Sequence, residues 1–295
     1  MDRSVAFLGL GVMGGYMAAN LAQGGYAVRG WNRTVGGPGE AVRPSIPIAT
    51  AAGVTLAPTL AAAVKNAGVV ITCLGDVPDV QEVLVDQVAA LLQPGTMIID
   101  TSTIGSSAAR EIGATLAAQG LRFLDAPVSG GDTGAKQGTL TIMVGGSEAD
   151  FQAAQPYLAT MGKTITHCGP VGSGQGVKMC NQILVSMNLV GICEAMLLAA
   201  AQGIDPQLVV NVCNQGAAAS WALENLGMKV AEGDFAPGFM IKHMLKDLRL
   251  IKEIAATHAQ ELPGTLYADQ LFQDVAALGG LDQGTQAMIR AYREG

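Results

Sequence analysis

The chain of 295 residues is poor in charged and aromatic side chains, which make up 14% and 4% of it. Apolar residues reach 49%, so the chain can bury a large core, and intrinsic disorder is excluded by composition. The formal net charge of -7 disfavours nucleic acid as a partner, because such binding depends largely on a basic surface. At this length two domains are the default expectation.

Cysteine and histidine are too few and too scattered for a metal centre. The five cysteines include no C-x-x-C pair, and the three histidines form no H-x-x-x-H pattern. We therefore predict buried free thiols in a reducing compartment and no metal site built by the protein. The chain shows no targeting signal, so we expect a cytoplasmic protein.

One apolar run, residues 183–201, is about as long as a membrane span. It contains Asn188, Gly191 and Glu194, and no cluster of Lys or Arg flanks it. We expect a helix surrounded by protein, and no membrane partner.

Short apolar runs alternate with alanine-rich segments of helical composition in the first half of the chain. This alternation predicts a largely parallel sheet covered on both faces. Residues 35–47 are rich in Gly and Pro and predict a loop. The predicted strands cover residues 4–10, 26–31, 69–74, 97–100, 122–126 and 141–144, and the predicted helices cover 13–23, 60–67, 80–92 and 106–119.

The pattern changes after Cys168, where the glycine-rich junction "GPVGSGQG" begins. From Val177 onward we find helical segments and no convincing strand. A long helix to about residue 202 comes first, followed by segments around 206–214, 220–230, 240–257, 265–277 and 285–292. We predict an α/β domain over residues 1–168 and an all-α domain over 169–295, joined by the long helix. A cleft at such a junction is a common position for an active site.

Gly9, Gly11 and Gly14 form a G-x-G-x-x-G motif directly between the first predicted strand and helix. This context is the one that dinucleotide binding of the Rossmann type requires. Amide groups from Gly9 to Gly14, including those of Leu10, Val12 and Met13, would face a pyrophosphate at the helix N-terminus. The alternative is a glycine-rich turn without a ligand.

The stretch "GWNRT" ends the second predicted strand, where NAD-binding chains usually carry Asp or Glu for the adenosine ribose. This chain has Asn32, Arg33 and Thr34 instead. An acidic residue would repel a 2′-phosphate, whereas Arg33 would attract one, and its neighbours can add neutral hydrogen bonds. We predict NADP as the cofactor, with NAD as a weaker one. The alternative is an arginine on a solvated loop that stacks on adenine without selecting a phosphate.

Four segments in fixed order resemble the β-hydroxyacid dehydrogenase family over essentially the whole chain. They are "FLGLGVMGGYMAANL" at 7–21, "DAPVSGGDTGAKQGTL" at 125–140, "GSGQGVKMCNQ" at 172–182 and "FMIKHMLKDLRL" at 239–250. The family includes 3-hydroxyisobutyrate dehydrogenase, tartronate semialdehyde reductase and glyoxylate/succinic semialdehyde reductases. The resemblance implies a Rossmann-type domain, a helical domain that often builds a dimer, and hydride transfer to or from a short carboxylate substrate.

The same resemblance assigns Lys178 as the catalytic residue. A cationic donor beside a carbonyl oxygen stabilises the negative charge that develops on reduction and delivers the proton. Asn181 and Gln182 lie within one turn of Lys178, and which of the two amides contacts the substrate is left open. The turn Ser129, Gly130 and Gly131 is expected to bind the substrate carboxylate through its amides and hydroxyl.

The remaining site residues also come from the resemblance. Leu74, Gly75 and Thr103 follow predicted strands and are expected to line the cofactor, and many relatives have Pro at the Gly75 position. Lys246 and Asp247 match a K-D pair near the nicotinamide. Phe239 resembles an apolar wall of the substrate pocket. Trp221 is expected in the core.

These features predict an NADPH-dependent reductase of small aldehyde acids such as glyoxylate or succinic semialdehyde, with Lys178 as general acid. The first alternative is an NAD(P)-dependent dehydrogenase of 3-hydroxyisobutyrate or a similar β-hydroxyacid. The second is a non-catalytic nucleotide-binding module used for protein interaction, which a lysine at position 178 disfavours. We expect a homodimer or homotetramer.

Overall fold

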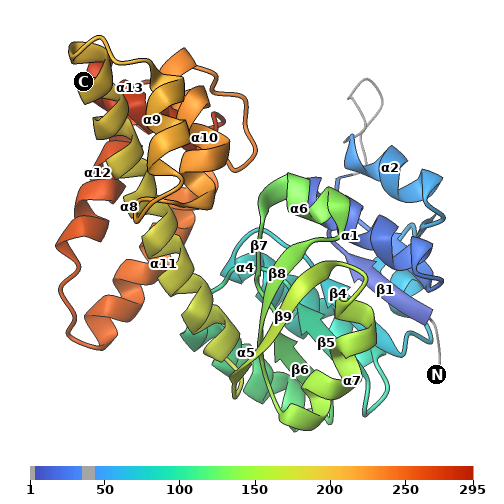
Figure 1. Cartoon of the computed structure of the whole chain (residues 1–295). Coiled ribbons are helices and arrows are strands. Elements are labelled where there is room, and N and C mark those ends of the chain that lie inside the picture. The colour runs from blue at the N-terminus through green and yellow to red at the C-terminus, as the bar shows by residue number, and fades with distance from the viewer. Residues whose placement is uncertain (1–3, 35–43, 295) are drawn as a thin grey trace. The chain divides into compact units, whose positions relative to one another are not determined.

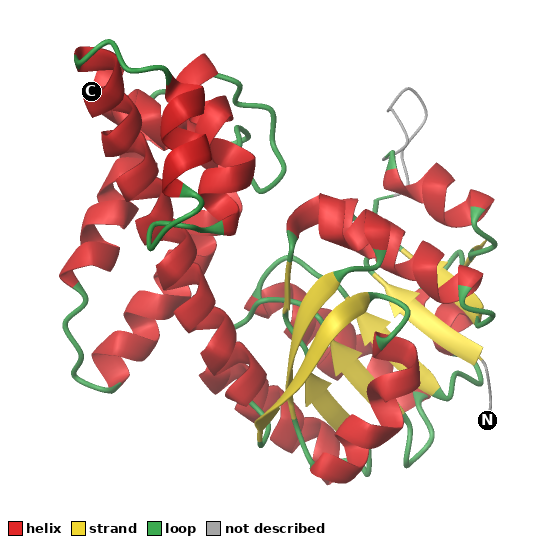
Figure 2. Cartoon of the chain, in the orientation of Figure 1, coloured by secondary structure: helices red, strands yellow, loops and turns green. Residues whose placement is uncertain are grey.

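The computed structural model describes residues 4–34 and 44–294. The chain forms two compact units, Met1–Lys178 and Met179–Gly295, each of which is described by itself. The first unit combines a sheet with helices, and the second is helical (Figures 1 and 2). This arrangement confirms the predicted fold class. The division between the two compact units falls inside the long helix, because the start of that helix is hydrogen-bonded to the sheet unit.

The described residues of the first unit form a nine-stranded sheet in the order β3-β2-β1-β4-β5-β6-β8-β7, with β9 paired to β8. The six strands β1 to β6 are mutually parallel, and β8 runs antiparallel to β6. The chain order therefore reverses between β1 and β4, the point at which open α/β sheets bind ligands. The strand bounds are β1 Ser4–Leu8, β2 Ala27–Trp31, β3 Thr55–Leu56, β4 Val69–Thr72, β5 Met97–Asp100, β6 Arg122–Asp125, β7 Val128–Ser129, β8 Leu140–Gly145 and β9 Gly162–Gly169.

Two cores cover the two faces of this sheet. Successive side chains of β1 point in opposite directions, so Val5 and Phe7 enter one core while Ala6 and Leu8 enter the other. The first core includes residues of α1 (Val12–Gln23), α2 (Ser45–Ala51) and α7 (Glu148–Leu158). The second includes residues of α3 (Leu60–Val64), α5 (Ser106–Ala118) and the helical stretch after β4. The parallel strands are buried on both faces for this reason.

The helical stretch after β4 changes its winding along its length. It begins as α4 (Val77–Val80), widens to a π-helical segment (Gln81–Val88) and ends in a 3-10 turn (Ala89–Leu91). Such wide turns are frequent beside functional sites. A further short helix, α6 (Gly131–Gln137), packs against α1 (Figure 1).

The predicted loop over residues 35–47 needs one correction. Residues 35–43 lie outside the described part of the chain, but α2 begins at Ser45 and includes Pro47. Proline is tolerated there because amide groups in the first helical turn have no partner inside the helix. The sequence patterns also missed β9 and α7.

The second unit consists of helices. α8 (Ser173–Ala201) starts in the first unit and continues into the second. The following helices are α9 Pro206–Cys213, α10 Trp221–Glu232, α11 Ile241–Thr257, α12 Pro263–Ala277 and α13 Ile289–Glu294, with a 3-10 turn at Thr285–Met288. Trp221 is 58% exposed, so its expected core position was wrong.

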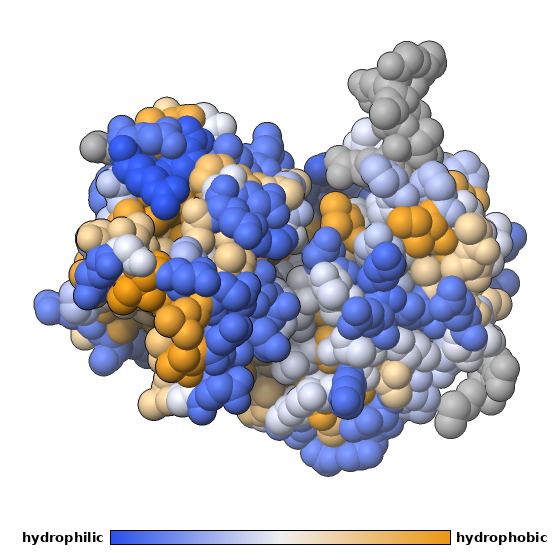
Figure 3. Space-filling view, turned by 45° about the horizontal axis from the view of Figure 1, so that its top comes forward, coloured by the Kyte–Doolittle hydropathy of each residue, from blue (hydrophilic) through white to orange (hydrophobic). Residues whose placement is uncertain are grey.

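α8 is long and apolar enough to cross a membrane by length and composition, and 39% of its most apolar window is buried within the protein. Core helices of soluble proteins meet the same test, so this property alone does not indicate a membrane. Hydrophobic surface is also visible on the helical unit in Figure 3. Its exposed apolar side chains include Leu184, Leu198, Leu208, Val212, Trp221 and Leu266.

Candidate active site

The glycine-rich turn between β1 and α1 is shaped by two close backbone approaches. Gly9 has a φ of 98°, and a Cβ added there would lie 2.2 Å from the carbonyl oxygen of Cys73. A Cβ on Gly14 would lie 1.9 Å from the carbonyl oxygen of Gly9. These two glycines are therefore required by the protein's own packing.

Gly11 differs from its two partners in the motif. Its φ of -67° suits any residue, and a Cβ there would meet nothing within 4 Å. α1 also begins without a side-chain cap on its first amide groups. Open space at Gly11 and uncapped amides at a helix N-terminus fit the close approach of a dinucleotide pyrophosphate. Leu10, Val12 and Met13 lie in or beside the same turn.

Asn32 connects this turn to the end of β2. Its Oδ1 accepts a hydrogen bond from the Leu10 amide at 2.8 Å, and its Nδ2 donates to the Thr34 carbonyl at 2.7 Å. Asn32 thereby positions the turn from the neighbouring strand. The Arg33 side chain is 66% exposed and pairs with Asp79, Nη1 to Oδ1, at 2.9 Å.

The loop after β5 is joined to the start of α8 by a buried side chain, Gln175. Its Oε1 accepts from the amides of Ile104 and Gly105 at 3.0 and 3.1 Å, and its Nε2 donates to the Ser102 carbonyl at 2.7 Å. The Ser102 hydroxyl accepts from the Leu74 amide at 2.8 Å. The loop that carries Thr103 is consequently fixed to the start of α8 and to the loop after β4.

Asp125 at the end of β6 holds the beginning of α8. Its carboxylate accepts from the amides of Gly172 and Gln175 at 2.7 and 2.9 Å. Burial raises the pKa of this carboxyl, and these backbone hydrogen bonds act in the opposite direction. A Cβ on Gly174 would lie 2.3 Å from the Met143 carbonyl oxygen, so glycine is needed for α8 to begin this close to the sheet. Lys178 follows along the same helix and is only 6% exposed.

Asp100 lies in the same buried layer at the end of β5. Its Oδ1 accepts from the Thr72 hydroxyl at 2.7 Å and from the Ser102 amide at 3.0 Å, whereas Oδ2 is buried without a hydrogen bond. Burial raises the pKa of Asp100 to about 6, against the lowering effect of these hydrogen bonds. Asp125 lies directly opposite on β6, and its charge raises this pKa further.

The expected carboxylate site follows β7. Gly130 and Gly131 have φ values of 126° and 64°, a conformation that favours glycine. Ser129, Gly130 and Gly131 are all half-buried, and a Cβ on Gly131 would meet no atom within 4 Å. The turn therefore has the glycine conformation and, at Gly131, the open space that an anion bound by backbone amides requires.

The second unit brings together a separate group of the predicted residues. Gln182 Nε2 donates to Asp247 Oδ2 at 2.6 Å, and Gln182 Oε1 accepts from Asn181 Nδ2 at 2.8 Å. Lys246 Nζ lies 3.2 Å from Asp247 Oδ1, at an angle that makes no hydrogen bond, and this carboxylate is 2% exposed. Phe239 is half-buried and its ring lies 6.0 Å from that of His243.

Sequence reasoning missed Ser102, Asp125 and Gln175, which hold the site loops without facing open space. Gln175 offered one signal in the sequence, a polar amide inside a glycine-rich junction, because most side-chain hydrogen bonds go to backbone groups or water. Asp79 was missed as well. The acid lies next to Gly75 in space, and nothing in the local pattern connects it to Arg33.

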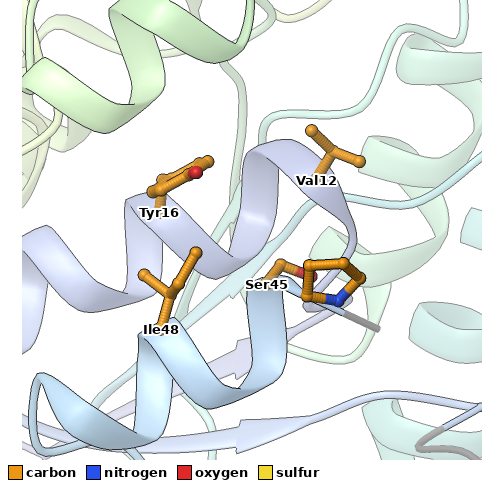
Figure 4. Close-up of a pocket in the computed structure, with 5 residues that line it drawn as sticks. Val12, Tyr16, Ser45 and Ile48 are labelled. Atoms are coloured by element: carbon orange, nitrogen blue, oxygen red, sulfur yellow. The ribbon is translucent and has the colours of Figure 1, made fainter. Parts of the chain in front are cut away.

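A hollow between α1 and α2 is a different feature. Val12 and Tyr16 from α1 and Ser45 and Ile48 from α2 surround it, together with Pro44 (Figure 4). Its volume of about 140 Å³ is small, and its lining is almost wholly apolar. A site for a small carboxylate needs polar groups aimed inward, so this hollow is not the substrate site.

The fold and the glycine turn define a dinucleotide-binding protein, and comparison with known proteins gives its family. Residues 4–169 match the NAD binding domain of 6-phosphogluconate dehydrogenase, and residues 172–292 match the NAD-binding domain of NADP-dependent 3-hydroxyisobutyrate dehydrogenase. An uncharacterized oxidoreductase of Synechocystis sp. is 52% identical, with 98% of each chain covered. The 2-hydroxy-3-oxopropionate reductase of Escherichia coli is 36% identical, covering 97% of this chain and 96% of the relative.

Among solved structures, the 3-hydroxyisobutyrate dehydrogenase of Mycobacterium tuberculosis with L-serine is similar over 99% of this chain and 100% of that chain. The TM-score is 0.88 and the identity is 35%. The chain belongs to the β-hydroxyacid dehydrogenase family. It is an oxidoreductase that acts on hydroxyl groups with NAD(P), in a family whose members act on small hydroxy acids.

Proposed function

We propose that this protein is an NADPH-dependent reductase of small aldehyde acids, with glyoxylate and succinic semialdehyde as the substrates to test first. The observation that carries the proposal is the pair of basic side chains at two defined places. Arg33 stands at the end of β2 where NAD-binding chains usually carry an acid, and Lys178 lies buried near the start of α8.

The choice of NADPH rests on charge. A 2′-phosphate carries negative charge and three acceptor oxygens, which suit the planar donor fork of arginine. The exposed Arg33 side chain is available to such an anion from solvent. Asn32 contributes indirectly, because its amide is used to hold the Leu10 amide and the Thr34 carbonyl.

The bound nicotinamide would supply the hydride for aldehyde reduction. In this proposal Lys178 stabilises the negative charge that develops on the carbonyl oxygen and donates the proton to it. Ser129, Gly130 and Gly131 hold the substrate carboxylate through amides and a hydroxyl. Asn181 and Gln182 orient the substrate oxygens, and Asp247 fixes the Gln182 amide. Leu74, Gly75, Thr103 and Lys246 are proposed cofactor contacts, and Phe239 is a proposed wall of the pocket.

A second candidate is NAD(P)-dependent oxidation of a β-hydroxyacid such as 3-hydroxyisobutyrate. The specific observation in its favour is the name of the similar solved structure, a 3-hydroxyisobutyrate dehydrogenase holding the β-hydroxyacid L-serine. The same residues serve both directions, because neutral Lys178 can take the proton from an alcohol.

We also propose that the protein is a homodimer formed through its helical unit. Exposed Leu184, Leu198, Leu208 and Trp221 make the described surface of this unit apolar at several positions. Sedimentation of the purified protein tests this assembly.

The decisive experiment is a screen of NADPH oxidation with glyoxylate, succinic semialdehyde, methylglyoxal and tartronate semialdehyde, repeated with NADH. The reverse reaction is measured with 3-hydroxyisobutyrate and L-serine. Higher kcat/KM for an aldehyde acid with NADPH supports the proposal, and preference for hydroxyacid oxidation with NAD selects the second candidate.

The role of Lys178 is tested by Lys178→Ala, which should lower kcat by about 10²–10⁴-fold while the Kd for NADPH changes little. The matched control is Lys163→Ala, at an exposed lysine on β9. Turnover of Lys178→Ala within tenfold of the unaltered enzyme would exclude Lys178 as the proton donor.

A further inference from the structure

The end of β2 carries a cation that already has an anionic partner inside the protein. Arg33 Nη1 lies 2.9 Å from Asp79 Oδ1 and 3.8 Å from Glu82 Oε2. Asp79 belongs to α4, which follows β4, and Glu82 belongs to the π-helical segment that continues it. Because β2 and β4 flank β1 in the sheet, the Arg33–Asp79 ion pair connects the two sides of the glycine-rich turn.

The carboxylate of Asp79 is fixed by its surroundings. Its Oδ2 accepts a hydrogen bond from the Asp76 amide at 3.1 Å, as part of a capping box at the start of α4. A Cβ on Gly75 would lie 2.6 Å from the same oxygen, so glycine at this position leaves room for the carboxylate. The Asp79 side chain is 28% exposed, against 66% for Arg33.

Arg33 therefore faces two candidate anions. One is Asp79, which pairs with it in the protein alone, and the other is the 2′-phosphate that the proposed function assigns to it. A planar guanidinium that binds one carboxylate must release or share its donors to bind a phosphate. The Asp79 charge also repels the phosphate directly.

We propose that Asp79 is a specificity-determining residue. It competes with the 2′-phosphate for Arg33 and so reduces the preference of the enzyme for NADPH over NADH. The inference rests on the proposed role of Arg33. The helix that follows β4, on the other side of β1, supplies an acidic group near the end of β2, where the chain itself carries none. A carboxylate at this end of the site is neutral or favourable toward a ribose hydroxyl and unfavourable toward a phosphate.

The test is equilibrium binding to the intact enzyme and its Asp79→Asn variant, by calorimetry, with NADPH, NADH, 2′,5′-ADP and 5′-ADP as titrants. The adenosine fragments lack nicotinamide, so the result does not depend on turnover. Asparagine retains an oxygen for the Asp76 amide and removes only the charge. We expect the affinity ratio of NADPH to NADH, and of 2′,5′-ADP to 5′-ADP, to rise about three- to tenfold.

Glu82→Gln is the matched control, because it removes a charge from the same neighbourhood at a longer distance and with greater exposure. Its effect on both ratios should stay below about twofold. If the two affinity ratios of Asp79→Asn are unchanged, Asp79 does not compete with the phosphate and the inference is overturned. If they fall, Asp79 orients Arg33 for the phosphate, and the inference is overturned as well.

Arg33→Ala separates this inference from the proposed function. If Arg33→Ala lowers the NADPH to NADH ratio and Asp79→Asn fails to raise it, only the role of Asp79 is overturned. If Arg33→Ala leaves the ratio unchanged, the NADPH assignment and the competition are both overturned. In the Arg33→Ala background, Asp79→Asn should change the ratio less than it does in the unaltered enzyme, because only the direct repulsion of the phosphate remains. An undiminished effect would refute competition through Arg33.

Discussion

Substitution of Gln175 by Ala should loosen the loop that carries Thr103. The Gln175 side chain is 0% exposed and makes three hydrogen bonds to backbone groups of residues 102–105. Alanine leaves the amides of Ile104 and Gly105 and the carbonyl of Ser102 without these partners. Each buried orphan costs about 1–3 kcal/mol, so a total loss of about 3 kcal/mol allows for partial relief by entering water.

The assay is thermal unfolding of the whole protein, followed by far-ultraviolet circular dichroism. A loss of about 3 kcal/mol corresponds to a fall in Tm of about 6–12 °C for a unit of this size. Hydrogen exchange should accelerate at the amides of Ile104 and Gly105. Because Thr103 is a proposed cofactor contact, the Kd for NADPH should rise about five- to tenfold.

Gln152→Ala is the matched control, because Gln152 is an exposed glutamine in the same unit whose side-chain amide donates to Glu148 on the helix surface. Its Tm should change by less than about 2 °C. A Gln175→Ala variant with a Tm within 2 °C of the unaltered protein and unchanged exchange at residues 104 and 105 would refute the reasoning.

Three further predictions concern the same unit. Gly11→Ala should preserve Tm and raise the Kd for NADPH at least tenfold, because a Cβ at position 11 meets no protein atom. Gly14→Ala should lower Tm, because a Cβ at position 14 meets the backbone of Gly9. Equal losses of Tm in the two variants would contradict this. Burial raises the pKa of Asp100 from 3.8 to about 6, so the protonated carboxyl stabilises the fold below pH 4, and this contribution of about 3 kcal/mol is lost as the pH rises through 6. Asp100→Asn should lack this loss in denaturation at pH 4 and 7.5, and parallel pH profiles of the two proteins would exclude this role of Asp100. Ser129→Ala should raise the substrate KM more than the cofactor KM in steady-state kinetics, and the reverse would move the carboxylate site elsewhere.

Local patterns in the sequence predicted the elements that bind the nucleotide. The strand, the glycine motif and the helix from residue 4 to 23 lie next to one another in the chain, and each has its own period or turn requirement. The helical second half was also predictable, because its segments keep a helical period. The helix α2 and the strand β9 were less predictable, since proline in a first helical turn and an edge strand carry weak local signals.

The residues that hold the site together depend on contacts between distant parts of the chain. Gln175 reaches residues 102–105, and Asp125 reaches the start of α8. Neither contact has a periodic signature, because the partners are backbone groups whose position follows from the order of the strands. The pKa of Asp100 near 6 has the same origin, since burial and the charge of Asp125 on the neighbouring strand both raise it.

The sequence by itself therefore determined the class of fold, the dinucleotide turn and the basic residues at positions 33 and 178, because these are written in adjacent residues with fixed spacing. Only the tertiary structure decided that Gly11 faces open space while Gly9 and Gly14 do not, and that Arg33 meets Asp79. The physical reason is that β1 lies between β2 and β4 in the sheet. This order brings the loop after β4 against Gly9 and the helix after β4 to the end of β2.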